Sequence, residues 1–126
     1  MKKIYFILAL VLSCSNALAS DSGDLEKKLP ITFKIALDPQ KSGVCLAANS
    51  IMAAEVKDFR ESVKQINAIL WAVIEEKQGK SKADITEGIA KEWTSAMNGN
   101  TDWALKQMKS YGCSDMNKEI GNFLQK

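Results

Sequence analysis

Histidine is absent from this 126-residue chain, and the sequence has only three cysteines and two prolines. Without histidine, the chain lacks the commonest general base of enzymes and a frequent metal ligand. The seven glycines are scattered singly, so no Gly-rich phosphate-binding loop is present. The serines lie in no recognisable nucleophile motif. We therefore expect no catalytic residue, no metal site and no cofactor, and we expect that the protein is not an enzyme.

Long apolar stretches are also rare, and the only one opens the chain in MKKIYFILALVLSCSNALAS. Two lysines precede an apolar run over residues 4–12, and the small residues Ala17 and Ala19 mark a cleavage site after Ala19. This layout is typical of a secretory signal peptide, so we expect residues 1–19 to be removed and the protein to be periplasmic. The alternative is acylation of Cys14, which makes the protein a lipoprotein. The run is too short to cross a hydrocarbon core of about 30 Å, which predicts no stable membrane insertion.

The remaining chain has no excess of either charge. Two of the 17 basic residues, Lys2 and Lys3, belong to the leader, which leaves 15 basic residues against 15 acidic ones. A balanced charge gives no indication of binding to nucleic acid or to an anionic membrane surface. We therefore expect the partner to be a protein, either a different protein or a second copy of this chain.

Two cysteines remain after the leader, Cys45 and Cys113. An even pair in an exported chain indicates a disulfide, and the alternative metal site has no histidine or third thiol to complete it. A bond across about 70 residues stabilises a chain by about 4 kcal/mol in the chain-entropy account. Redox catalysis normally uses a closely spaced Cys-x-x-Cys pair, which is missing. We predict a structural clamp that joins the C-terminal helix to the start of the helical domain.

The segment 20–42 contains the one strand-like pattern of the chain, ITFKIAL, in which Ile31, Phe33 and Ile35 alternate with less apolar residues. A lone strand has no partner for its backbone groups. The favoured interpretation is an extended arm that packs on its own domain. The alternatives are a strand added to another protein or second copy, and a short helix after Pro30. Phe33 and Ile35 are therefore candidate partner contacts.

From Val44 to Ile74 apolar residues recur at spacings of three and four, which predicts helix. Asp58 and Glu61 imitate a capping box, so a hairpin of two helices that meet near Asp58 is favoured over one long helix or a coiled coil.

A turn at KQGKSK then predicts the start of a third helix, and its expected buried face comprises Ile85, Ile89, Trp93 and Met97. A short segment capped by Asn100 or Thr101 follows, and Ser114 is the expected cap of the last helix. The prediction is an all-α fold, a small bundle of four to five helices over residues 43–126 with the N-terminal arm and one disulfide.

The tryptophans are further candidates for contact with a partner. Trp71 lies beside the main apolar stripe and Trp103 follows a helix cap, whereas Trp93 is in register with the core of its helix. Partly exposed tryptophan is a frequent binding hot spot. We interpret Trp71 and Trp103 either as partner contacts or as the edge of the core, and we assign Trp93 to the core.

Two segments carry a resemblance to a known family, VCLAANSIMAAEV around Cys45 and LKQMKSYGCSDMNKEIGNFL around Cys113. Together they resemble the small periplasmic immunity proteins of the Rap/Tai type, which protect bacteria against cell-wall amidases delivered by type VI secretion. The resemblance implies an exported, all-helical immunity protein that neutralises a wall-degrading effector. The alternative hypothesis is a periplasmic chaperone or adaptor that binds proteins through apolar helix faces or through the N-terminal arm.

Overall fold

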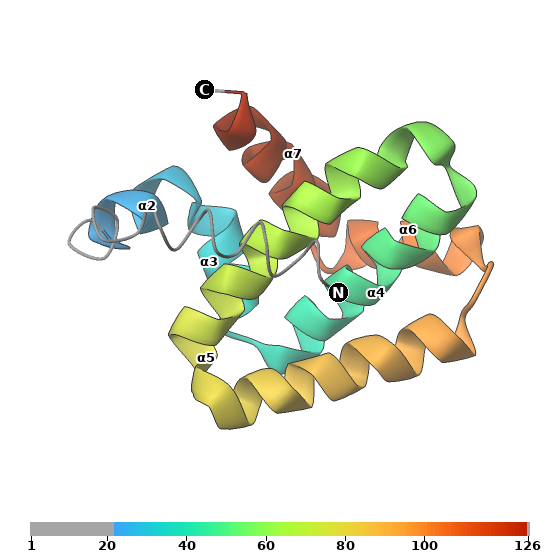
Figure 1. Cartoon of the computed structure of the whole chain (residues 1–126), viewed down its shortest axis with the longest axis horizontal. Helices are drawn as coiled ribbons and strands as arrows, with labels where there is room; N and C mark the ends of the chain where they lie inside the picture. Colours follow the sequence, from blue (N-terminus) through green and yellow to red (C-terminus); the bar gives the residue numbers. More distant parts are fainter. Residues whose placement is uncertain (1–21, 126) are drawn as a thin grey trace.

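The computed structural model describes residues 22–125, and the regular structure of that range is helical throughout (Figure 1). Its helices are α2 (Ser22–Lys28), α3 (Pro30–Ala36), α4 (Pro39–Glu55), the short 3-10 helix η1 (Lys57–Phe59), α5 (Arg60–Ala96), α6 (Thr101–Ser110) and α7 (Cys113–Leu124). The all-α bundle is confirmed: α4 to α7 form the part in which four to five helices were expected, and α2 and α3 bring the total of the described range to six α-helices. No helix within 22–125 has the length and hydropathy needed to cross a membrane. The proposed signal peptide and Cys14 lie outside the described residues.

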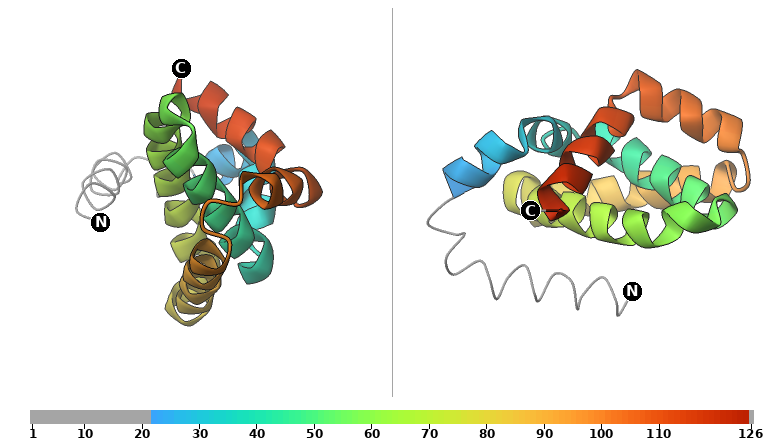
Figure 2. Two further views of the ribbon diagram at one scale, coloured as in Figure 1. Left: turned by 90° about the vertical axis from the view of Figure 1, so that its right-hand side faces the viewer. Right: turned by 90° about the horizontal axis from the view of Figure 1, so that it is seen from above.

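Helix α4 is the centre of the bundle. It packs most extensively against α5 and next against α6, and Figure 2 shows it between these two helices. Its N-terminus is capped by Asp38, whose carboxylate accepts hydrogen bonds from the backbone N–H groups of Gln40 and Lys41. The helix begins at Pro39, earlier than the expected start at residue 43. The earlier start is possible because Asp38 satisfies the first amides of the helix and proline suits the first helical turn.

The predicted break near Asp58 is confirmed. Helix α4 ends at Glu55, and η1 turns the chain into α5. The Arg60 guanidinium donates hydrogen bonds to the carbonyl oxygens of Ala53 and Ala54, at 3.2 and 3.4 Å. These are orphan carbonyls of the last turn of α4, so one side chain at the start of α5 closes the hairpin.

The KQGKSK turn is a sharp bend inside α5. Gly79 has φ 77° and ψ 170°, a backbone conformation that is nearly restricted to glycine. The Gln78 side chain braces the bend, because its amide nitrogen donates to the Ala36 carbonyl at 2.6 Å and to the Ser42 hydroxyl at 3.2 Å. Its amide oxygen accepts from the Thr86 hydroxyl at 2.7 Å, beyond the bend. The second half of α5 is thereby returned along α4 (Figure 1).

The expectation of an extended or strand-like arm is wrong, and the alternative of a short helix after Pro30 is right. Helix α3 buries Thr32, Phe33 and Ala36, which follow Leu29 at helical spacings of three and four. A helix pairs part of its backbone groups within itself, whereas a single strand needs a neighbouring strand for all of them, and the described residues form no strand.

The start of α3 is held by the C-terminal helix. The Glu119 carboxylate on α7 accepts hydrogen bonds from the Ile31 and Thr32 backbone N–H groups, at 3.1 and 2.8 Å, and from the Thr32 hydroxyl at 2.8 Å. A carboxylate at a helix N-terminus satisfies orphan amides and complements the helix dipole. The segment expected to be an arm is therefore part of the packed bundle.

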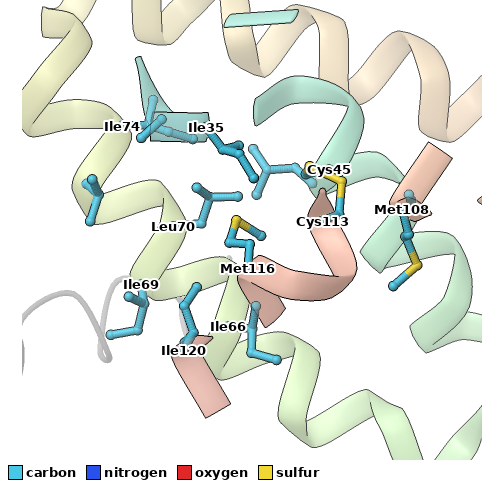
Figure 3. Packing of buried hydrophobic residues seen from close by; sticks show 14 of the residues in the cluster. Ile35, Cys45, Ile66, Ile69, Leu70, Ile74, Met108, Cys113, Met116 and Ile120 are labelled. Atoms are coloured by element: carbon cyan, nitrogen blue, oxygen red, sulfur yellow. A yellow bond between two sulfur atoms is a disulfide. The ribbon is translucent and has the colours of Figure 1, made fainter. Parts of the chain in front are cut away.

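The predicted Cys45–Cys113 disulfide is confirmed, with 5.5 Å between the two Cα atoms. Both cysteines are completely buried. Figure 3 shows the bond between α4 and the start of α7, close to Met116 and Leu70 of the core. The last helix starts at Cys113, after Gly112 in the left-handed conformation at φ 76°, so the expected Ser114 cap is wrong. The chain changes direction between α6 and α7, and glycine adopts this positive φ without the steric penalty of a side chain.

A cluster of three asparagine side chains, of which Asn49 and Asn117 are buried and Asn67 is half-buried, also ties α4, α5 and α7 together. Asn49 and Asn117 exchange two hydrogen bonds of 3.0 and 2.8 Å, and the Asn49 amide also donates to the Asn67 carbonyl oxygen at 3.0 Å. Buried amides need such partners, because an unpaired polar group in the core is costly. The cluster fixes the register of three helices.

Candidate functional site

The four predicted contact residues have different surroundings in the structure. Phe33 and Ile35 are buried, with 3% and 4% of their surfaces exposed, because α3 directs them into the core. They present almost no surface to a partner. Trp71 and Trp103 are half-buried and pack against the edge of the core. These two tryptophans therefore remain as candidate contacts.

Trp103 stacks on Trp93, with 5.2 Å between the ring centroids and 22° between the ring planes. The assignment of Trp93 to the core is wrong, since its side chain is only half-buried. The pair joins the second half of α5 to α6. The Asn100 side chain accepts a hydrogen bond from the Trp103 backbone N–H at 2.9 Å, so the cap that starts α6 also positions the stacked ring.

An apolar flank of α5 continues from the tryptophan pair. Ile85, Ile89 and Trp93 follow at intervals of four residues and share one side of the helix. Ile85 is 57% exposed and Ile89 is half-buried, so the face that was expected to be buried is partly open. We call the surface formed by Ile85, Ile89, Trp93 and Trp103 the aromatic edge.

Close packing of two helices positions this surface. A Cβ atom built on Gly43 of α4 would lie 2.6 Å from the Cγ2 atom of Ile89 and 3.1 Å from the Thr86 carbonyl oxygen. Only glycine allows α4 and α5 to approach so closely at this point. The α5 part of the aromatic edge is therefore attached to a buried helix contact, whereas Trp103 belongs to α6.

The opposite flank of the same helix half is charged. Lys91 and Glu87 form an ion pair of 2.8 Å. The hydrogen bond that Lys91 donates to the Glu87 carboxylate, together with the negative charge of that carboxylate, raises the pKa of Lys91 above its ordinary value. This half of α5 therefore carries a charged flank beside an apolar one.

The chemistry available at the aromatic edge is apolar contact and stacking. Within residues 22–125 no group of three or more histidine, cysteine, aspartate or glutamate side chains is placed to hold a metal ion. The local sequence pattern did not identify Trp93 as a surface residue, because a spacing of four fits a buried and a half-buried face equally well.

Comparison with known proteins found no relative: no family model, no curated protein and no solved structure is significantly similar to the chain.

Proposed function

We propose that this protein is an exported, non-enzymatic binding protein that recognises another protein through its aromatic edge. The observation that carries the proposal is the half-exposed stack of Trp93 and Trp103, continued by the exposed Ile85. Tryptophan is enriched among residues whose truncation weakens protein complexes most. A stack that is already formed also loses little side-chain freedom on binding.

In its more specific form, the proposal is an immunity protein that neutralises a cell-wall-degrading effector. Support comes from the resemblance of the segments around Cys45 and Cys113 to the Rap/Tai-type immunity proteins, together with the helical fold and the buried disulfide. An inhibitor needs a rigid surface and no chemistry of its own. The disulfide, the Asn49 cluster and the Gln78 brace supply that rigidity.

A capture experiment tests the proposal. Oxidised protein of residues 20–126 is immobilised and exposed to periplasmic extracts of the source organism and its competitors, and retained proteins are identified by mass spectrometry. We expect one wall hydrolase in equimolar amount. Trp93→Ala and Trp103→Ala should each weaken its binding at least about tenfold, which corresponds to about 1.4 kcal/mol.

The matched control is Leu37→Ala, since Leu37 is 61% exposed at the end of α3, outside the aromatic edge. The Leu37→Ala variant should bind the partner with the same affinity as the unmodified protein. Unchanged binding by both tryptophan variants would exclude the aromatic edge as the contact surface.

The second candidate function is a periplasmic chaperone or adaptor. The observation in its favour is the dispersed exposure of large apolar side chains, which includes Leu105 at 52% and Val56 at 41%. Retention of many unrelated proteins, in place of one equimolar partner, supports this function and excludes the immunity function. A dimer seen by light scattering at assay concentration would identify a second copy as the partner.

A further inference from the structure

The turn between α5 and α6 contains the one Asn–Gly pair of the sequence, Asn98–Gly99. Both residues are exposed, and Gly99 has φ 79°. The turn is fixed on each side of the pair, because Met97 N–H donates to the Trp93 carbonyl at 2.8 Å and Asn100 N–H donates to the Met97 carbonyl at 2.9 Å. No hydrogen bond joins the Gly99 amide to another residue of the described range.

We propose that Asn98 is a site of spontaneous deamidation, and that its conversion alters the aromatic edge. The Gly99 backbone nitrogen attacks Cγ of Asn98. The new N–Cγ bond forms as the Cγ–Nδ2 bond breaks, and ammonia leaves. Glycine favours this attack because it has no Cβ to obstruct the approach, and the unbonded amide loses no hydrogen bond when it gives up its proton.

The product of this step is a five-membered succinimide, which water opens at either of its two carbonyl carbons. Opening at Cγ gives aspartate at position 98. Opening at the former backbone carbonyl gives isoaspartate, in which the main chain runs through Cβ and Cγ. Water is the only co-reactant, and the exposure of Asn98 supplies it.

The position of the turn gives the reaction a structural consequence. The turn fixes the position of Asn100, whose side chain caps α6 by accepting a hydrogen bond from the Trp103 amide. Isoaspartate lengthens the main chain two residues before this cap, which moves α6 relative to α5 and disturbs the Trp93–Trp103 stack. The new carboxylate also enters a region that already holds Glu55, whose Oε1 lies 3.9 Å from a Cβ atom built on Gly99.

The test is an incubation of the oxidised protein in mildly alkaline buffer, followed over time by peptide mapping and by near-ultraviolet circular dichroism. We expect the mass increase of amide-to-acid conversion in the peptide that contains residue 98. Enzymatic methylation specific for isoaspartate should label the same peptide. The dichroism of the stacked tryptophans should fall in proportion to the isoaspartate fraction. Asn98→Gln should prevent both changes, and Asn122, exposed on α7, serves as an internal reference.

Two results would overturn the inference. The first is an unmodified Asn98 in the folded protein under conditions in which the denatured, reduced chain converts there, because the fold then protects the pair. The second is complete conversion with unchanged tryptophan dichroism, because the turn is then uncoupled from the stack. The loss of partner binding on conversion rests on the proposed function, but neither readout needs a partner, so the two ideas fail separately.

Discussion

At the scale of single residues, the bundle depends on a few positions at which only one residue type fits. Gly43 is the clearest of them, because the neighbouring Ile89 side chain and the Thr86 carbonyl occupy the space that a Cβ atom would need. The aromatic edge lies on the helix that packs at this glycine, so a change at Gly43 reaches the proposed binding surface.

We expect Gly43→Ala to lower the free energy of unfolding by about 1–3 kcal/mol, the usual cost of overpacking. The matched control is Gly88→Ala on α5, where nothing lies within 4 Å of the added atom. That change should raise the free energy of unfolding by about 0.5–1 kcal/mol, since alanine is the better helix former. Urea unfolding of both variants measures these changes. Equal unfolding midpoints for the two variants would contradict the close contact between α4 and α5.

A second residue-scale prediction concerns the asparagine cluster. Asn49→Ala leaves Asn117 and Asn67 without their partner in or near the core, so we expect a loss of about 1–3 kcal/mol. Asn122→Ala makes the same chemical change on an exposed part of α7 and should have little effect on the unfolding midpoint. If the two variants unfold alike, the cluster contributes no net stability.

At the scale of elements, apolar periodicity predicted the longer helices and missed two seven-residue ones, α2 and α3. The hairpin near Asp58 was predicted from an apparent capping box, but no side chain caps the start of α5, and Arg60 closes the hairpin instead. The bend was predicted from the local KQGKSK sequence and lies at Gly79. In α3 only seven residues are available, and Ile31, Phe33 and Ile35 alternate by chance. The decisive contact for α3 comes from Glu119, far along the chain, and no local pattern contains it.

The same limit applies to the candidate site. A partly exposed Trp103 was predictable from its place after a helix cap. Its pairing with Trp93 was not, because the stack depends on how α5 and α6 are placed around α4. Local sequence fixes the spacing of side chains along a helix, but only the assembled bundle fixes which of them remain open to solvent.

An element-scale prediction follows for α3. We expect Glu119→Gln to weaken the cap and to lower the free energy of unfolding by about 1 kcal/mol, because hydrogen bonds to a charged acceptor become bonds to a neutral one. Hydrogen exchange at the Ile31 and Thr32 amides should accelerate more than exchange in α5. Glu76→Gln, on an exposed surface of α5, is the control and should change neither quantity. Unchanged exchange at Thr32 would show that α3 is held by its apolar side chains alone.

At the scale of the whole molecule, the disulfide is a covalent link between parts of residues 22–125 that are far apart in the sequence. It spans a sequence separation of 68 and is completely buried. We expect reduction to remove about 4 kcal/mol and to lower the melting temperature by about 15 °C or more. The double variant Cys45→Ala/Cys113→Ala should melt close to the reduced protein. Oxidised and reduced proteins that melt alike would refute the clamp.

The bond between Cys45 and Cys113 also gives the molecule the topology of a ring with two tails. The ring contains most of α4, all of α5 and all of α6, whereas α3 and most of α7 are tails that meet outside it through Glu119. One cut by a protease anywhere between the two cysteines opens the ring but releases no fragment. A nicked molecule therefore keeps its mass apart from one added water, and it separates into two pieces only after reduction.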